Sequence, residues 1–262
     1  MIKLIATDMD GTLLNPLKKV GKNFESVITE LNKKGIIFAL ASGRNYQRIK
    51  DKFKNMNVEL MYISDNGNYI EYKGEILNKS ILAKDDVVNL CKFLKNKKGC
   101  KASYSNEKAI YTDDKIVHKI GRIFMYKSEL VESVEKLKED IIKCSILVTP
   151  SKHDELLNEL IAKFPHLHIV SSSKHTIDVN YGSMNKGEAV KLLRDKYSFT
   201  EDEVMVFGDY LNDTEMMTSC NHSYAVANAH EEIKRIAKYV APSNKRNGVL
   251  RTIEEVVLNK KD

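Results

Sequence analysis

Residues 2–12 read IKLIATDMDGT: an apolar run of strand length, then two aspartates one residue apart, then a glycine. In an extended chain, residues i and i+2 point to the same side, so Asp8 and Asp10 can face one crevice. Two carboxylates that close repel each other unless a proton or a cation lies among them. The stretch therefore indicates either a site for a hard cation such as Mg²⁺ or a tight Asp-Gly turn.

Similar apolar runs recur along the chain and alternate with segments of helical period. The expected strands are residues 2–6, 36–41, 60–64, 204–208, 223–227 and 239–242. Phe24, Val27, Ile28 and Leu31 have the i, i+3, i+4, i+7 spacing of a helix that buries one face. Apolar strands alternating with such helices predict an α/β fold, a doubly wound parallel sheet covered on both faces.

The middle of the chain has a different pattern, with shorter and more alternating apolar runs. Strands are expected in AIYT (109–112), RIFMY (122–126), SILVTP (145–150) and LHIVSSS (167–173), and helices near 87–94 and 156–164. This pattern is typical of an α+β unit whose strands keep one face in water. We therefore expect a core from residues 1–81 and 184–262, and an inserted α+β cap over residues 82–183.

The composition is that of a globular protein, with 42% hydrophobic and 30% charged residues among 262. No apolar run approaches the roughly 20 residues that cross a bilayer, and the N-terminus has no signal-peptide pattern. We therefore expect a cytoplasmic protein with no membrane partner. Four dispersed cysteines without a CxxC pair predict neither a zinc site nor a disulfide framework.

The net charge of +6 comes from intermingled lysine and glutamate, without an Arg-rich arm or a basic helix interleaved with aromatic residues. Such a charge suits an anionic small molecule as well as a nucleic acid. Because the other signs of nucleic-acid binding are missing, we expect no nucleic-acid partner.

Further candidate residues follow the expected strands, at the edge where ligands bind in an open parallel sheet. They are Ser42, Gly43, Asp209, Asn212 and Asp213. Asp209 or Asp213 could complete a cation site with Asp8. Ser42 could also cap a helix over residues 43–55, and Asn212-Asp213 could cap a helix through Met216.

The order of four short motifs resembles the signature of the haloacid dehalogenase (HAD) superfamily. The motifs are Asp8-Met9-Asp10-Gly11-Thr12, Ala41-Ser42-Gly43-Arg44, Asn185-Lys186-Gly187, and Gly208-Asp209 with Asn212-Asp213. The chain is most similar to the Cof-type branch, Mg²⁺-dependent phosphatases with a large inserted C2B-like α+β cap. The resemblance covers essentially the whole chain, including VANAHEEIKRIAKYVAPSNKRNGV at residues 226–249.

The resemblance implies a role for each matching residue. Asp8 is implied to be the nucleophile that forms an aspartyl-phosphate. Asp10 is implied to protonate the leaving oxygen and then to take a proton from the attacking water. Lys186 is implied to neutralise charge on the phosphoryl group during transfer. These three are the expected catalytic residues.

The same resemblance implies the ligand sets. The substrate phosphate is expected to contact Ser42, Gly43, Lys186 and Asn212. Mg²⁺ is expected to be held by the side chains of Asp8 and Asp209 and by the main-chain carbonyl of Asp10. Asp213 is expected to orient Lys186 or the waters of the metal.

These expectations together describe a monomeric enzyme that hydrolyses small phosphate monoesters with Mg²⁺, and sugar phosphates are the expected substrate class. Substrate choice is expected to reside in the cap rather than in the four motifs. Two alternatives remain open: a phosphomutase on the same fold, and a module that binds phosphate or sugar phosphate without turnover. His166 and His168, spaced i, i+2, are expected to mark a solvated strand edge rather than a metal pair.

Overall fold

The structure is a computed structural model that describes residues 1–124 and 127–259. The chain divides into two compact units. The first comprises Met1–Gly43, Lys52–Leu77 and Met184–Asp262, and the second comprises Arg44–Asp51 and Asn78–Ser183. Within the described ranges, no helix is long and apolar enough to cross a membrane.

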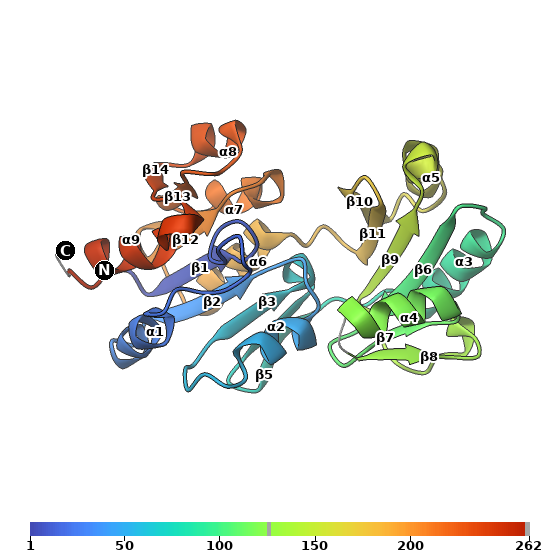
Figure 1. Ribbon diagram of the computed structural model, residues 1–262, viewed down its shortest axis with the longest axis horizontal. Helices are drawn as coiled ribbons and strands as arrows, with labels where there is room; N and C mark the ends of the chain where they lie inside the picture. The colour runs from blue at the N-terminus through green and yellow to red at the C-terminus, as the bar shows by residue number, and fades with distance from the viewer. Residues whose placement is uncertain (125–126, 260–262) are drawn as a thin grey trace. The chain divides into compact units, whose positions relative to one another are not determined.

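The first unit is built on a sheet that has eight strands within the described residues, in the order β14-β13-β12-β1-β2-β3-β4-β5 (Figure 1). The strands from β14 to β3 are mutually parallel, and β4 runs antiparallel to β3. The bounds are β1 (Leu4–Asp8), β2 (Ile37–Ala41), β3 (Met61–Ser64), β4 (Tyr69–Tyr72), β5 (Glu75–Lys79), β12 (Val204–Gly208), β13 (His222–Val226) and β14 (Tyr239–Ala241).

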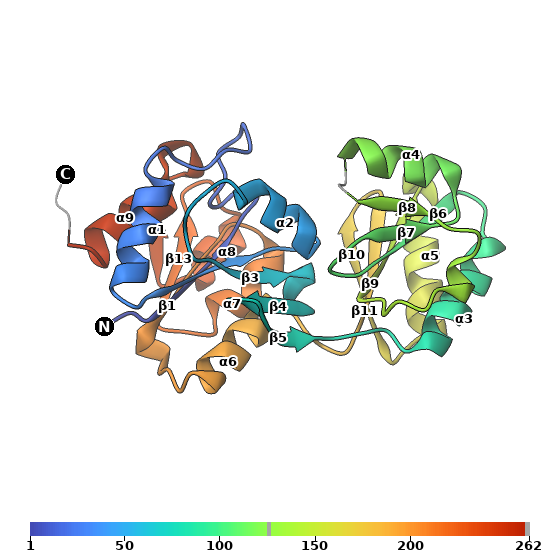
Figure 2. The ribbon, with the colours of Figure 1, turned by 90° about the horizontal axis from the view of Figure 1, so that it is seen from below.

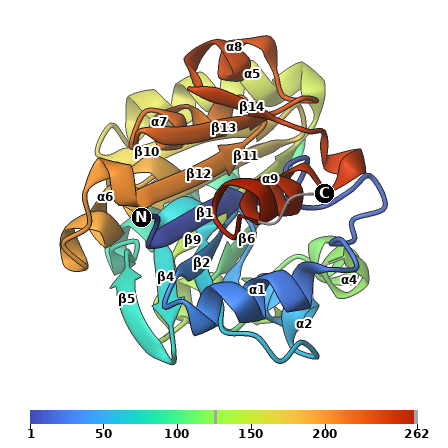
Figure 3. The same cartoon turned by 90° about the vertical axis from the view of Figure 1, so that its left-hand side faces the viewer.

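Helices lie on both faces of this sheet (Figure 3), which confirms the predicted doubly wound parallel fold. α1 contacts α9 on one face, and α6 contacts α7 on the other. The predicted apolar stripe of α1 is buried. The bounds are α1 (Phe24–Lys33), α6 (Lys186–Lys196), α7 (Thr214–Met217), α8 (Glu231–Ile236) and α9 (Gly248–Val256), with short 3₁₀ turns η1 (Asp65–Gly67), η3 (Glu201–Glu203), η4 (Leu211–Asp213) and η5 (Asn244–Arg246). Most of α2 (Tyr46–Phe53) is assigned to the second unit.

The second unit contains a mainly antiparallel sheet, in which the described residues form six strands in the order β10-β11-β9-β6-β7-β8 (Figure 2). One face is covered by α3 and α5, which share a hydrophobic core with the strands. The bounds are α3 (Lys84–Lys95), β6 (Cys100–Ser105), β7 (Ile110–Thr112), α4 (Lys115–Phe124), β8 (Ser128–Leu130), η2 (Val134–Lys136), β9 (Lys143–Val148), α5 (Pro150–Lys163), β10 (Leu167–Ser173) and β11 (Thr176–Tyr181).

One element of the second unit differs from its predicted type. Residues 122–124 of the expected strand RIFMY form the end of helix α4, and residues 125–126 lie outside the described ranges. Asp114 starts this helix, because its Oδ1 accepts hydrogen bonds from the amides of Ile116 (2.8 Å) and Val117 (2.9 Å). The prediction of a strand was wrong because a run of large apolar residues suits a strand and a helix alike.

Candidate active site

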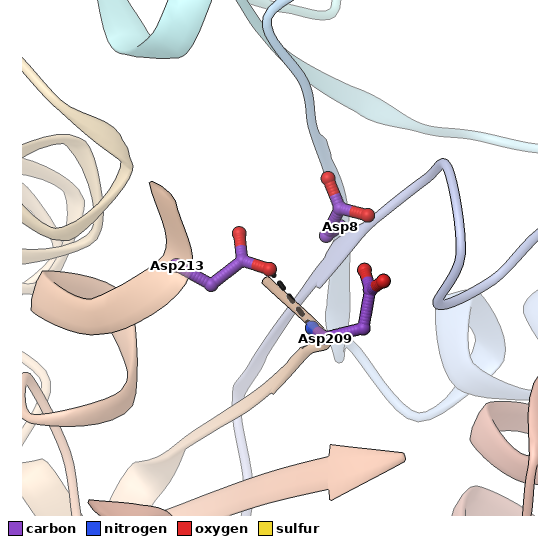
Figure 4. Close-up of side chains that lie close together, drawn as sticks. All are labelled: Asp8, Asp209 and Asp213. Carbon is purple, nitrogen blue, oxygen red and sulfur yellow. Dashed lines mark hydrogen bonds between the residues drawn. The ribbon is translucent and has the colours of Figure 1, made fainter. Parts of the chain in front are cut away.

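Three aspartates converge at the carboxyl edge of the parallel sheet. Asp8 is the last residue of β1, and Asp209 follows the last residue of β12, its parallel neighbour. Asp213 ends η4, the short turn after β12. One carboxylate oxygen from each of the three lies within 4.8 Å of the other two (Figure 4). Strands far apart in sequence thus supply one acidic cluster.

Lys186 lies against this cluster as a buried cation. It is the first residue of α6, which Asn185 caps by accepting a hydrogen bond from the amide of Glu188. Its ammonium group donates to Asp8 Oδ1 at 2.5 Å and to Asp213 Oδ1 at 2.7 Å, and the side chain is only 1% exposed. A lysine buried to this extent needs such partners, since an isolated buried charge is strongly unfavourable.

Asp213 is held on both carboxylate oxygens. Oδ1 accepts from Lys186, and Oδ2 accepts from the backbone amides of Asp209 (2.9 Å) and Tyr210 (3.3 Å). Gly208 leaves room for this carboxylate, because a Cβ there would come within 2.7 Å of it. Asp213 occupies the N-cap position of α7, as the capping alternative predicted, but its side chain makes no capping hydrogen bond to that helix. Its contacts instead position Lys186 and the turn after β12.

Asp209 is fixed from the loop that follows β1. Thr12 Oγ1 donates to Asp209 Oδ1 at 2.7 Å. Gly11 has a φ of +95°, and a Cβ on it would come within 2.2 Å of Asp209 Oδ2, so only glycine suits this turn. Asn228 Nδ2 donates to the carbonyl of Gly11 at 2.8 Å. Thr12 and Asn228 were not among the predicted site residues, although both lie in the segments that carried the family resemblance.

The side chain of Asp10 lies outside the group of three aspartates. It is half-buried, and Oδ1 accepts a hydrogen bond from the ammonium group of Lys18 at 2.8 Å, an ion pair within the same loop. The metal ligand implied for this residue is its main-chain carbonyl, which leaves the carboxylate available for proton transfer.

The predicted phosphate-binding residues are placed at the same strand ends. Ser42 is buried and follows Ala41, which is the register partner of Asp8 across β1 and β2. Its amide donates to the carbonyl of Ile63 at 2.8 Å, and its carbonyl accepts from the amide of Asn66 at 2.9 Å. These bonds tie the chain to β3, and the helix begins only at Tyr46, so the prediction that Ser42 caps it was wrong.

Gly43 and Asn212 differ in how closely they are packed. Gly43 is half-buried, and a Cβ on it would lie 3.2 Å from the side chain of Asn66. Asn212 is exposed in η4, directly before Asp213. Neither residue belongs to the acidic cluster, and both remain candidates for binding a phosphoryl group.

Electrostatics at the cluster favour a cation. Burial raises the pKa of Asp8 to about 8; Lys186 opposes this shift, and the charges of Asp213 and Asp209 add to it. Burial also raises the pKa of Asp209. For Lys186, burial lowers the pKa, but Asp213 and Asp8 outweigh it and hold the pKa above its ordinary value. The single positive charge of Lys186 therefore does not neutralise the negative charges of three carboxylates.

The oxygen atoms available in the cluster fit a hard divalent cation. Asp8 Oδ2 is buried and accepts no hydrogen bond from any described residue. A buried oxygen without a donor is unfavourable by about 1–3 kcal/mol, and a metal ion would satisfy it. Asp209 offers a second carboxylate from the neighbouring strand end. Asp213 has both oxygens engaged already, so it suits a supporting role better than a ligand role.

The second unit carries a polar row that the sequence analysis did not single out. Register places His168, Asn180, Lys143 and Ser105 directly opposite one another across four strands, so their side chains share a face. Asn180 is 2% exposed and Lys143 is 7% exposed. Asn180 Oδ1 and His168 Nδ1 are buried and have no hydrogen-bond partner among the described residues. The strict alternation in TIDVNY (176–181), with Ile177 and Val179 in the core, was the available signal.

The two histidines considered above differ in their surroundings. His166 is exposed and its Nε2 lies 2.8 Å from Asp86 Oδ1. His168 lies on β10, an edge strand, but its Nδ1 is buried rather than solvated.

Comparison with known proteins decides the family. The sequence profile of the haloacid dehalogenase-like hydrolases matches residues 5–253. The chain belongs to this family. The matched range includes the aspartate cluster and Lys186, and it covers most of both units.

Relatives within the HAD-like hydrolases are similar to the chain over nearly their full length. The 5-amino-6-(5-phospho-D-ribitylamino)uracil phosphatase YbjI of Escherichia coli is 28% identical over 98% of this chain and 96% of its own. The phosphatase YcsE of Bacillus subtilis, which has the same descriptive name, is also 28% identical, with the same coverage. The crystal structure of SMU.1108c from Streptococcus mutans is 30% identical, with a TM-score of 0.86 over 98% of this chain and all of that one.

Proposed function

We propose that the protein hydrolyses small phosphate monoesters, with Asp8 as the nucleophile and Mg²⁺ as the cofactor. The observation that supports the proposal is the buried carboxylate of Asp8, which is ion-paired to Lys186 through one oxygen and has a second oxygen that accepts no hydrogen bond from any described residue. A nucleophilic carboxylate needs a lone pair that no hydrogen bond occupies and a cation nearby that absorbs the charge of the phosphoryl group.

In the first step, the carboxylate of Asp8 attacks phosphorus and the bond from phosphorus to the alcohol oxygen breaks. Asp10 donates a proton to that oxygen, so the alcohol leaves in its neutral form. In the second step, water attacks the phosphorus of the aspartyl-phosphate, and Asp10 takes the proton that this water loses. Inorganic phosphate is released, and both aspartates return to their initial state.

The remaining site residues neutralise negative charge and keep the reacting groups in position in both steps. Lys186 neutralises charge shared by Asp8 and the phosphoryl oxygens, and Asp213 fixes the position of its ammonium group. Ser42, Gly43 and Asn212 are proposed to bind the phosphoryl oxygens. Binding at these oxygens would hold the phosphoryl group beside Asp8, and such positioning is a large part of catalysis.

Asp8, Asp209 and the main-chain carbonyl of Asp10 are proposed to hold Mg²⁺. When bound, the ion supplies neutralisation of the negative charge that builds up on the phosphoryl group. Thr12 and Gly11 support this role, because they fix the Asp209 carboxylate beside β1.

The function is tested by measuring inorganic phosphate released from a panel of phosphate monoesters, each supplied as a single substrate with Mg²⁺. The proposal expects release with multiple turnovers and kcat/KM values that differ among esters. Isomerisation of a sugar phosphate without phosphate release would identify a phosphomutase instead. Binding of sugar phosphate with no turnover of any ester would identify a binding module.

Removal of divalent cations tests the cofactor separately. Dialysis against EDTA is expected to reduce the rate to below about a tenth of its starting value, because the acidic cluster loses its counter-charge. Restoring Mg²⁺ should recover the rate, whereas Na⁺ at equal ionic strength should not. Full activity in metal-free buffer, with residual metal measured by elemental analysis, would contradict the assignment.

The substrate class is proposed to be a phosphorylated sugar or polyol. Two relatives are named for a substrate with a phosphoribityl chain.

A further inference from the structure

Helix α4 (Lys115–Phe124) exposes three isoleucines at helical spacing. The exposed fractions of Ile116, Ile120 and Ile123 are 57%, 36% and 67%. Separations of four and three residues place them on one face of the helix. Single exposed apolar side chains are common, but a stripe of three on one helix indicates a contact surface.

The stripe faces outward because the other side of α4 is docked on the second sheet (Figure 2). Val117 and Gly121 are buried, and a Cβ on Gly121 would come within 2.8 Å of Ser128 Oγ on β8. His118 Nδ1 lies 3.1 Å from the same hydroxyl. With Asp114 capping its first turn, α4 is a fixed helix whose isoleucines cannot turn inward.

Three cations accompany the stripe. Lys115, Lys119 and Arg122 are exposed, and within the described ranges none of their side chains forms an ion pair or a hydrogen bond. α4, with the sequence KIVHKIGRIF, contains no acidic residue. On the helical wheel the cations lie together beside the isoleucines, away from the docked face. The helix therefore presents positive charge next to apolar surface.

We propose that α4 is a docking element for an anionic lipid surface, with the isoleucines inserted at the boundary between headgroups and acyl chains. Long basic side chains can extend to the headgroups while a neighbouring apolar stripe is buried. The expectation of no membrane partner was based on the lack of a bilayer-spanning apolar run and of a signal-peptide pattern, and a helix that lies in the interface needs neither. This inference does not depend on the proposed phosphatase activity.

Other occupants fit the observations less well. In a symmetric dimer through α4, the three cations of one copy would face those of the other. Three isoleucines also supply far less area than the roughly 800 Å² per partner that a stable protein interface buries. A nucleic acid would match the cations but would leave the isoleucines in water. Anionic lipid satisfies both features at once.

The test uses the full chain and extruded vesicles, either pure phosphatidylcholine or the same lipid with about one third phosphatidylglycerol, a composition that gives a negative surface. Sedimentation should carry the protein down with anionic vesicles and not with neutral ones. Raising the salt concentration should weaken the binding, because the Debye length shortens. Absence of binding to anionic vesicles at low salt would overturn the proposal.

Matched variants locate the contact. K115Q/K119Q/R122Q should weaken binding about tenfold or more, and I116S/I123S should do the same through lost insertion. K33Q/K34Q/K98Q removes the same charge from exposed lysines elsewhere and should leave binding nearly unchanged. Equal loss in this control triple would show a response to net charge alone. Full binding by the isoleucine variant would show that no insertion occurs. Either result would overturn the proposal.

The chain has no tryptophan, so one introduced indole reports its surroundings without background. Ile123→Trp should shift its emission to the blue on addition of anionic vesicles. Val240→Trp, at an exposed position on β14, should not. Two outcomes would overturn the proposal and assign the isoleucines of α4 another role. If the protein self-associates and I116S/I123S abolishes this, the partner of the isoleucines is a second copy of the chain. If I116S/I123S lowers kcat/KM without any change in vesicle binding, α4 contributes to phosphatase turnover.

Discussion

Asp8→Asn is expected to lower phosphate release by about 10⁴-fold or more, because an amide cannot form the aspartyl-phosphate and loss of a nucleophile removes most of the catalytic unit. The substitution keeps the size of the side chain and one oxygen that accepts from Lys186. Substrate binding should therefore persist while turnover is lost. Rapid-quench experiments should detect no phosphorylated protein with D8N under conditions that trap it with the unmodified chain.

The same variant should not be destabilised. Burial raises the pKa of Asp8 to about 8 from an ordinary value of 3.8. A raised folded-state pKa for a carboxyl means that stability falls as pH rises from 3.8, and the loss is complete above about pH 8. Asparagine carries no charge and avoids this loss. In EDTA at pH 8, the thermal midpoint of D8N should equal or exceed that of the unmodified chain.

Two controls make the result for D8N decisive. Asparagine can deamidate back to aspartate, so the mass of the protein is measured before and after each assay. Asp10→Asn should retain the ability to form phosphorylated protein from an ester with a good leaving group, since Asp8 is intact. Substantial turnover by D8N of verified mass would exclude Asp8 as the nucleophile.

Lys186→Met is expected to reduce kcat by about 10² to 10³-fold, which is the usual effect of losing one preorganised charge donor at the reacting group. The side chain is only 1% exposed and its ammonium group lies 2.5 Å from Asp8 Oδ1 and 2.7 Å from Asp213 Oδ1. Lys191→Met, on an exposed face of the same helix, should leave kcat unchanged.

K186M should also lower the free energy of unfolding, and a second variant can separate this effect from the loss of catalysis. Removing one partner of a buried ion pair leaves the others uncompensated and destabilises by about 3–5 kcal/mol. The double variant K186M/D213N also removes the charge of Asp213 and should recover part of that loss, since only Asp8 then lacks its lysine partner, while the variant remains inactive. If activity returned together with stability in the double variant, Lys186 would have a structural role only.

Much of the core could be predicted from the sequence. Its strands are continuous apolar runs, and its helices have apolar residues at helical spacing. The alternation of such strands and helices along the chain predicted a parallel sheet. In such a sheet the carboxyl ends share one edge, which is why Asp8 and Asp209 could be expected together despite some 200 intervening residues. The predicted strand 204–208 agrees with β12 (Val204–Gly208).

The errors occurred where tertiary contacts outweigh local pattern. Ser42 resembled a helix cap, but hydrogen bonds to Ile63 and Asn66 hold its backbone against β3, and the helix starts four residues later. RIFMY resembled a strand, yet α4 forms there because Asp114 caps it and Val117 and Gly121 dock on β8 and its neighbours. Neither set of contacts can be inferred from neighbouring residues alone.

The sequence by itself determined the family resemblance, the parallel core and the order of the candidate site residues, because strand ends and motif order can be read along the chain. Only the tertiary structure decided that Asp213 uses both oxygens to position Lys186 and the turn after β12, that Asp8 has a buried oxygen without a donor among the described residues, and that α4 exposes its isoleucines. Those features depend on which groups are removed from water and on what meets them there. Burial is a property of the folded chain as a whole, and for that reason it gives identical residue patterns different chemical roles.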